Sequence, residues 1–245
     1  MEQAAEALLR RHRAVSIAAL VLLVGLAWAW LVAGAGMPTA AMAMPMPSEA
    51  PRFLLTWSMW AVMMVAMMVP SAAPVILLYG RAARKHDLAG GSARFLLGYL
   101  LAWSSYALVA ALLQLSLEHS GAVSMATMAV GQPKLSGLVL IGAAIYQLSP
   151  WKGACLSRCR NPADFIARNH RLGPLRMGLS HGSWCVGCCW ALMLLLFVGG
   201  VMNLAWIAAL TLLVATEKLV SFGRWIAPVS AIILLAWGTV LLVAG

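Results

Sequence analysis

Charged side chains are scarce in this sequence, and acidic ones are the scarcest. Asp, Glu, Lys and Arg make up 10% of the 245 residues, and only seven residues are Asp or Glu. A typical soluble domain carries about 25% charged residues, so an ordinary soluble protein is excluded. The sequence also lacks a G-x-x-x-x-G-K-[ST] phosphate-binding loop and a separate polar domain, which excludes a nucleotide-driven pump.

Apolar residues dominate instead: 63% of the chain is hydrophobic and the mean hydropathy is +0.89. A helix needs about 20 apolar residues to cross a bilayer. The sequence therefore predicts an all-α, polytopic membrane helix bundle, a single transmembrane domain over residues 1–245 that lies in the lipid bilayer. Seven spans are expected, at about residues 14–35, 54–79, 95–117, 135–149, 177–199, 201–222 and 225–244.

The basic residues are unevenly divided among the segments between these spans. Fifteen of the 17 Lys and Arg residues lie in alternate segments, which are 1–13, 81–94, 152–176 and 218–224. The other two are Arg52 and Lys134. Because Lys and Arg concentrate in cytoplasmic loops, the amino terminus is expected in the cytoplasm and the carboxyl terminus outside. This arrangement accounts for the net charge of +10 without a nucleic-acid or nucleotide partner.

Residues 181–190, H-G-S-W-C-V-G-C-C-W, hold three of the five cysteines and lie inside the fifth expected span. At about 100° per residue, His181, Cys185, Cys188 and Cys189 share one helix face. Thiolate and imidazole groups suit Cu(I) or zinc. The pattern predicts a metal or thiol site in the cytoplasmic half of this span, with the packing of small apolar cysteines as the alternative.

Three further residues are expected at the same depth. Cys155 and Cys159 lie in a basic loop, where a helical turn would place both thiols on one face as metal ligands. Simple loop filling is the alternative. Glu217 lies at the edge of the sixth span beside Lys218, and an intramembrane charge is a functional candidate. The alternative is an interfacial pair that extends to the cytoplasmic surface.

Methionine is concentrated in a Met- and Pro-rich external loop at 36–53 and in the span that follows it. Nine of the 15 methionines lie there, namely Met37, Met42, Met44, Met46, Met59, Met63, Met64, Met67 and Met68. Thioethers favour Cu(I), so Met63, Met64, Met67 and Met68 are candidate ligands. Soft packing inside the bundle is the alternative. Pro70 and Pro74 are expected to disturb this second span.

Four blocks of the sequence occur together and in order. They are W-S-M-W-A-V-M-M-V-A-M-M-V-P-S-A-A-P (57–74), Y-Q-L-S-P-W-K-G-A-C-L-S-R-C-R (146–160), H-G-S-W-C-V-G-C-C-W-A-L-M (181–193), and G-V-M-N followed by E-K (200–218). In these blocks the chain resembles an uncharacterised bacterial family, a domain of unknown function described as predicted metal-binding integral membrane proteins. The resemblance implies the bacterial inner (cytoplasmic) membrane and a metal, with copper favoured and zinc as the alternative. It implies no established reaction.

Three functions are compatible with these patterns. The favoured one is a non-enzymatic protein that binds, transfers or transports Cu(I) between the outer methionines and the inner cysteines. The second is an accessory or assembly subunit of a larger membrane complex, with that complex or a metal chaperone as its partner. The third is a quinone-linked thiol–disulfide oxidoreductase, which the cytoplasmic placement of the cysteines disfavours.

Overall fold

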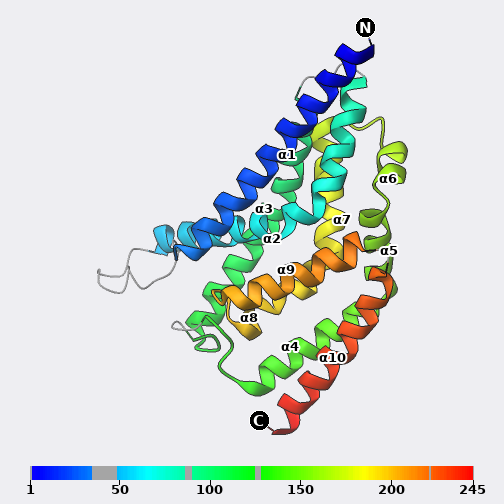
Figure 1. Ribbon diagram of the computed structural model, residues 1–245. Helices are drawn as coiled ribbons and strands as arrows, with labels where there is room; N and C mark the ends of the chain where they lie inside the picture. Colours follow the sequence, from blue (N-terminus) through cyan, green and yellow to red (C-terminus); the bar gives the residue numbers. More distant parts are fainter. Residues whose placement is uncertain (1, 35–48, 86–89, 125–127, 221, 245) are drawn as a thin grey trace.

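The computed structural model describes residues 2–34, 49–85, 90–124, 128–220 and 222–244 (Figure 1). Within these ranges the secondary structure is helical, apart from an isolated bridge between Val123 and Val130. The helices are α1 (Glu2–Val32), α2 (Glu49–Lys85), α3 (Gly91–His119), α4 (Pro133–Gln147), α5 (Pro150–Arg160), α6 (Pro162–Arg168), α7 (Pro174–Leu194), α8 (Leu196–Gly199), α9 (Leu204–Leu219) and α10 (Gly223–Ala244). The predicted all-α class is confirmed.

In the described part of the chain, five helical segments are long and apolar enough to cross a membrane. They are Arg13–Val32, Ala50–Ala83, Gly91–His119, Pro174–Gly199 and Trp225–Ala244. The helices in the expected fourth and sixth spans are shorter than these five segments: α4 has 15 residues and α9 has 16. Helix α9 begins late because Gly200 adopts a φ of 91° and the Asn203 side chain caps the helix, accepting from the Trp206 amide at 3.2 Å.

The Met- and Pro-rich segment is largely outside the described residues. This applies to residues 36–48, with Met37, Met42, Met44 and Met46 among them. The remainder of the expected loop is helical, since α2 begins at Glu49.

Helices α3 and α7 pack side by side and run in the same direction. Gly178 of α7 lies against the backbone of Phe95 in α3, and one turn later Gly182 lies against Tyr99 and Ala102. A Cβ atom on Gly182 would come within 2.6 Å of the Ala102 Cβ. The close approach of the two helices therefore requires glycine at these positions, which is the use of small residues four apart in membrane helices.

The chain between α3 and α7 returns along α7 in the opposite direction. At one end, the Val130 amide donates to the Phe197 carbonyl at 2.8 Å. Further along, the Tyr146 hydroxyl donates to the Gly187 carbonyl, and the Phe165 ring lies 5.0 Å from the His181 ring. Helices α4, α5 and α6 together therefore cover the distance that α7 covers alone.

Helix α9 also runs against α7, and α10 runs against α4. The Trp206 indole donates to the Leu195 carbonyl at 2.8 Å, and Lys218 at the other end of α9 reaches Cys185. Gly238 of α10 faces Gly137 of α4. Figure 1 shows α4 and α10 side by side at the end of the molecule where the carboxyl terminus lies.

Helix α2 continues through both of its prolines. Pro70 has no amide hydrogen to donate to the carbonyl four residues earlier, at Ala66. The indole of Trp28 on α1 donates to this carbonyl instead, at 3.2 Å. A neighbouring helix thus satisfies the acceptor that the proline leaves free, and Figure 1 shows α2 bending along its length.

Candidate metal site

Thiols from α5 and α7 meet in the interior. The segment expected as a basic loop is helical because Ser149 caps α5, accepting from the Lys152 amide at 3.2 Å, and Pro150 occupies its first turn. This turns Cys159 toward α7, with its Sγ 3.9 Å from the Cys188 Sγ. The Cys188 Sγ lies 3.3 Å from the Cys189 Sγ. All three side chains are buried.

Cys185 lies one turn earlier on α7, where two polar side chains contact its sulfur. The Lys218 ammonium of α9 donates to the Cys185 Sγ at 2.8 Å, and the Tyr99 hydroxyl of α3 lies 3.1 Å from it. Lys218 also donates to the Ser71 hydroxyl at 3.3 Å. The Tyr99 hydroxyl donates to the Met68 carbonyl at 3.1 Å. Four helices therefore contribute groups around this sulfur.

His181 packs among aromatic rings one turn before Cys185. The side chains of Phe95 and Tyr99 lie 6.0 Å from its ring, and Phe165 lies 5.0 Å away. The residue is 2% exposed, and its Nδ1 has no hydrogen-bond partner among the atoms that the structure describes. A buried ring nitrogen without a hydrogen-bond partner is costly.

Cys155 lies near the other thiols but outside their contacts. It is half-buried against α7, where a Cβ on Gly187 would come within 3.0 Å of its sulfur. Burial raises the pKa of the Cys155 thiol, and the positive charge of Arg158 opposes this shift. The Arg158 guanidinium itself lies 3.9 Å above the Trp184 ring.

Glu217 takes part in a different set of contacts. Lys152 forms an ion pair with its carboxylate at 2.6 Å, and both side chains are at most 2% exposed. Gln147 donates to the same carboxylate at 2.9 Å and to the Ser230 hydroxyl at 2.7 Å, and it accepts from Lys152. The structure therefore separates Glu217 from the thiols and joins it to α4, α5 and α10.

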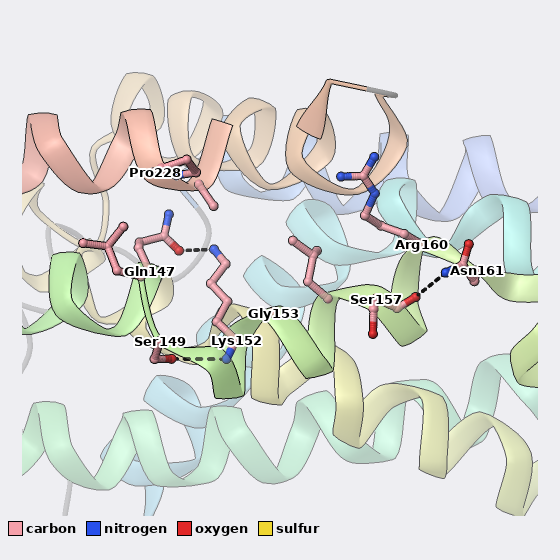
Figure 2. A pocket seen from close by; sticks show the side chains of 11 residues that line it. Gln147, Ser149, Lys152, Gly153, Ser157, Arg160, Asn161 and Pro228 are labelled. Atoms are coloured by element: carbon pink, nitrogen blue, oxygen red, sulfur yellow. Dashed lines mark hydrogen bonds between the residues drawn. The ribbon is translucent and has the colours of Figure 1, made fainter. Parts of the chain in front are cut away.

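A cavity of about 600 Å³ lies beside this ion pair. Figure 2 shows Lys152 extending from α5 toward Gln147, with Pro228 of α10 opposite. Arg160 lies at the other end of α5. Five residues of α5 line this cavity, and Cys159 is not among them.

The candidate methionines are buried in the core. The side chains of Met63, Met64, Met67 and Met68 are at most 1% exposed. Their α2 helix is connected to Cys185 through the Met68 carbonyl and the Tyr99 hydroxyl. The methionine stripe therefore faces the interior of the bundle.

The structure brings together several residues that were candidates from the sequence. It also adds residues that were not candidates. The cysteines of α7 and Cys159 of α5 meet as one group of thiols. Tyr99, Lys152 and Gln147 carry no signal in the sequence analysis, although Gln147 and Lys152 are polar residues on either side of the proline that ends an apolar run. Their partners, 65 to 86 positions away in the chain, can be read only from the fold.

The sulfur separations test whether a metal would fit. In the described residues, no group of three or more His, Cys, Asp and Glu side chains forms a ready metal site. A metal–thiolate bond of about 2.3 Å places two sulfurs about 3.8 Å apart at a tetrahedral angle and about 4.6 Å apart in a linear pair. The Cys159–Cys188 separation of 3.9 Å lies in this range, and the Cys188–Cys189 separation of 3.3 Å lies below it. The pair that joins α5 to α7 therefore fits a bridging metal best.

The described residues thus form a helical bundle with five helices long and apolar enough to cross a membrane and with a buried group of thiols. Proteins of this class carry soft sulfur ligands in their interior. Residues 57–241 match a family model described as PpoB2, copper chaperone. The match covers most of the chain, so the chain belongs to this copper-chaperone family. No curated protein and no solved structure matches the chain.

Proposed function

We propose that this chain is an integral membrane copper chaperone that carries Cu(I) on the thiols shared by α5 and α7. Cys159 and Cys188 hold the ion, and Cys185, Cys189 and His181 supply the ligands for its exchange. The observation that carries the proposal is the 3.9 Å separation of the Cys159 and Cys188 sulfurs across two helices. The description of the family supports copper as the cargo.

The proposed chemistry is ligand exchange without a change of oxidation state. Two thiols give up their protons as they bind Cu(I), since thiolate is the form that binds metal. An incoming thiolate or thioether forms a bond to the ion as one of the original thiolates leaves. Soft sulfur ligands select Cu(I), and exchange between neighbouring sulfurs moves the ion without releasing it to water.

The proposed topology has seven crossings of the bacterial inner membrane, with the amino terminus in the cytoplasm. The shared direction of α3 and α7 supports it, because the segment between them must return across the same distance. Helices α4 and α9 are about 22–24 Å long, shorter than the roughly 30 Å of a typical hydrocarbon core, so local thinning of the bilayer accompanies them. On the outer side, Glu118 forms an ion pair with Arg52 at 2.6 Å. This pair cancels one of the two outer positive charges and so increases the difference in net charge between the inner and outer sides.

The proposed recipient is a copper-containing membrane complex, for which this chain is an assembly factor. A chaperone requires a partner that takes its metal. In the proposed topology the methionines of residues 36–48 lie outside and the cysteines lie toward the cytoplasm, so soft ligands are available on both sides. The methionines of α2 lie between them along the same helix bundle.

The test is copper retention by the purified protein and its cysteine variants. The protein is loaded anaerobically with Cu(I), challenged with a Cu(I) chelator and assayed by elemental analysis for copper and zinc. Wild type is expected to retain copper, whereas Cys159→Ser and Cys188→Ser are expected to lose most of it. Cys155→Ser, a matched change on the same helix, is expected to retain it. Wild type without retained copper, or unchanged retention in both ligand variants, would overturn the proposal.

A further inference from the structure

Lys218 places a buried positive charge directly beside the thiols. Its ammonium lies 2.8 Å from the Cys185 Sγ and 3.3 Å from the Ser71 hydroxyl, and the residue is 7% exposed. Lysine is almost never buried unless it is paired. Here the group that faces it is a sulfur rather than a carboxylate.

The adjacent carboxylate does not neutralise this charge. Glu217 precedes Lys218 on α9, but consecutive side chains on a helix point about 100° apart. The Glu217 carboxylate is bound by Lys152 at 2.6 Å and by Gln147 at 2.9 Å. The charge of Lys152 is therefore balanced by Glu217, whereas the positive charge of Lys218 acts on the thiols.

We propose that Lys218 sets the preference of this site for Cu(I) over Zn(II), an inference that rests on the proposed function. Cu(I) carries one charge fewer than Zn(II), so with any given number of thiolates its complex is one charge more negative. A fixed positive charge nearby favours the more negative complex. The preference follows from charge when the two ions bind the same number of thiolates.

The geometry gives the size of the effect. When Cys185, one of the proposed exchange ligands, binds the ion, the metal lies within about 5 Å of the ammonium, given a metal–thiolate bond of about 2.3 Å. At an effective dielectric constant of about 20, one charge–charge interaction at this distance corresponds to roughly a hundredfold change in an equilibrium constant. Removing the charge of Lys218 should change the ratio of the Cu(I) and Zn(II) affinities by up to that factor, and by less when only Cys159 and Cys188 hold the ion.

The test compares both affinities in variants that remove, keep or cancel the charge. Affinities of the purified protein are measured by competition with a Cu(I) chelator under anaerobic conditions and with a zinc-binding dye. Lys218→Met should lower the Cu(I)/Zn(II) affinity ratio by up to about a hundredfold, and Lys218→Arg should keep most of the wild-type ratio. Lys134→Met, which removes an exposed lysine at the start of α4, should leave the ratio as in wild type.

A second variant tests the charge while the lysine stays in place. Ser71→Asp puts a carboxylate next to the Lys218 ammonium and should also lower the ratio, whereas Ser71→Asn should change it much less. An unchanged ratio in either Lys218→Met or Ser71→Asp, or an equal loss of both affinities, would overturn the assignment while leaving copper binding intact. Absence of Cu(I) binding in wild type would instead refute the proposed function.

Discussion

Lys152→Met is expected to destabilise the protein by about 3–5 kcal/mol, because it leaves the Glu217 carboxylate buried without its positive partner. The two charged groups lie 2.6 Å apart, and neither side chain is more than 2% exposed. Gln147 still donates to the carboxylate at 2.9 Å in the variant, but one neutral hydrogen bond does not replace an ammonium. For a chain of this length the loss corresponds to a fall in the unfolding temperature on the order of 10 °C.

The assay is thermal unfolding of the detergent-purified protein, followed by tryptophan fluorescence. Lys152→Met combined with Glu217→Gln removes both charges and should recover most of the lost stability, because the pair is then replaced by neutral groups of similar size. Asp164→Asn is the matched control, since it breaks the exposed pair with Arg168 and should hardly shift the transition. If the double variant were as unstable as the single one, an uncompensated charge would not be the cause.

Two further changes test how the helices pack, by the same unfolding assay. Gly178→Leu should lower the unfolding temperature more than any change above, because its Cβ would collide with the backbone of Phe95 and force α3 and α7 apart; a variant as stable as wild type would contradict the packing. Trp28→Phe should cost about 1–3 kcal/mol by leaving the Ala66 carbonyl without a donor, and an effect no larger than for a surface change would show that this carbonyl has another partner.

Helix positions could be predicted from the sequence because apolar runs and proline breaks are local signals. The expected fifth span at 177–199 falls within the helical segment Pro174–Gly199. The face shared by Cys185, Cys188 and Cys189 follows from helical periodicity, and all three are buried. These features need no information about which helices are neighbours.

Helix ends were predicted less well where backbone geometry and capping decide them. Hydropathy alone extends the sixth span from residue 201 to residue 222, but α9 is confined to Leu204–Leu219 by Gly200, Asn203 and the turn that follows Leu219. Basic composition suggested a loop at 152–176. The Ser149 cap and the proline after it start a helix there all the same.

Partners across the fold could not be predicted from the sequence. Cys159 and Cys188 are 29 positions apart, and the sequence predicts both at one depth as ligands of one site without showing that they meet. Charge distribution predicts the depth of a residue in a membrane, but its position relative to the other helices depends on which helices pack together. The close packing of α3 on α7 and the return of α5 along α7 determine that position, and both depend on contacts between distant residues.

Glu217 and Lys218 show what this difference means for function. As adjacent opposite charges at the edge of an apolar run, they suggest a functional intramembrane charge or an interfacial pair that extends to the cytoplasmic surface. The fold gives each a separate environment, with Glu217 bound to Lys152 of α5 and Lys218 bound to Cys185 of α7. Neutralising Glu217 should therefore act mainly on stability, and neutralising Lys218 mainly on the choice of metal. In this proposal, two residues that are neighbours in the sequence have separate roles, one in the stability of the fold and one in the choice of metal.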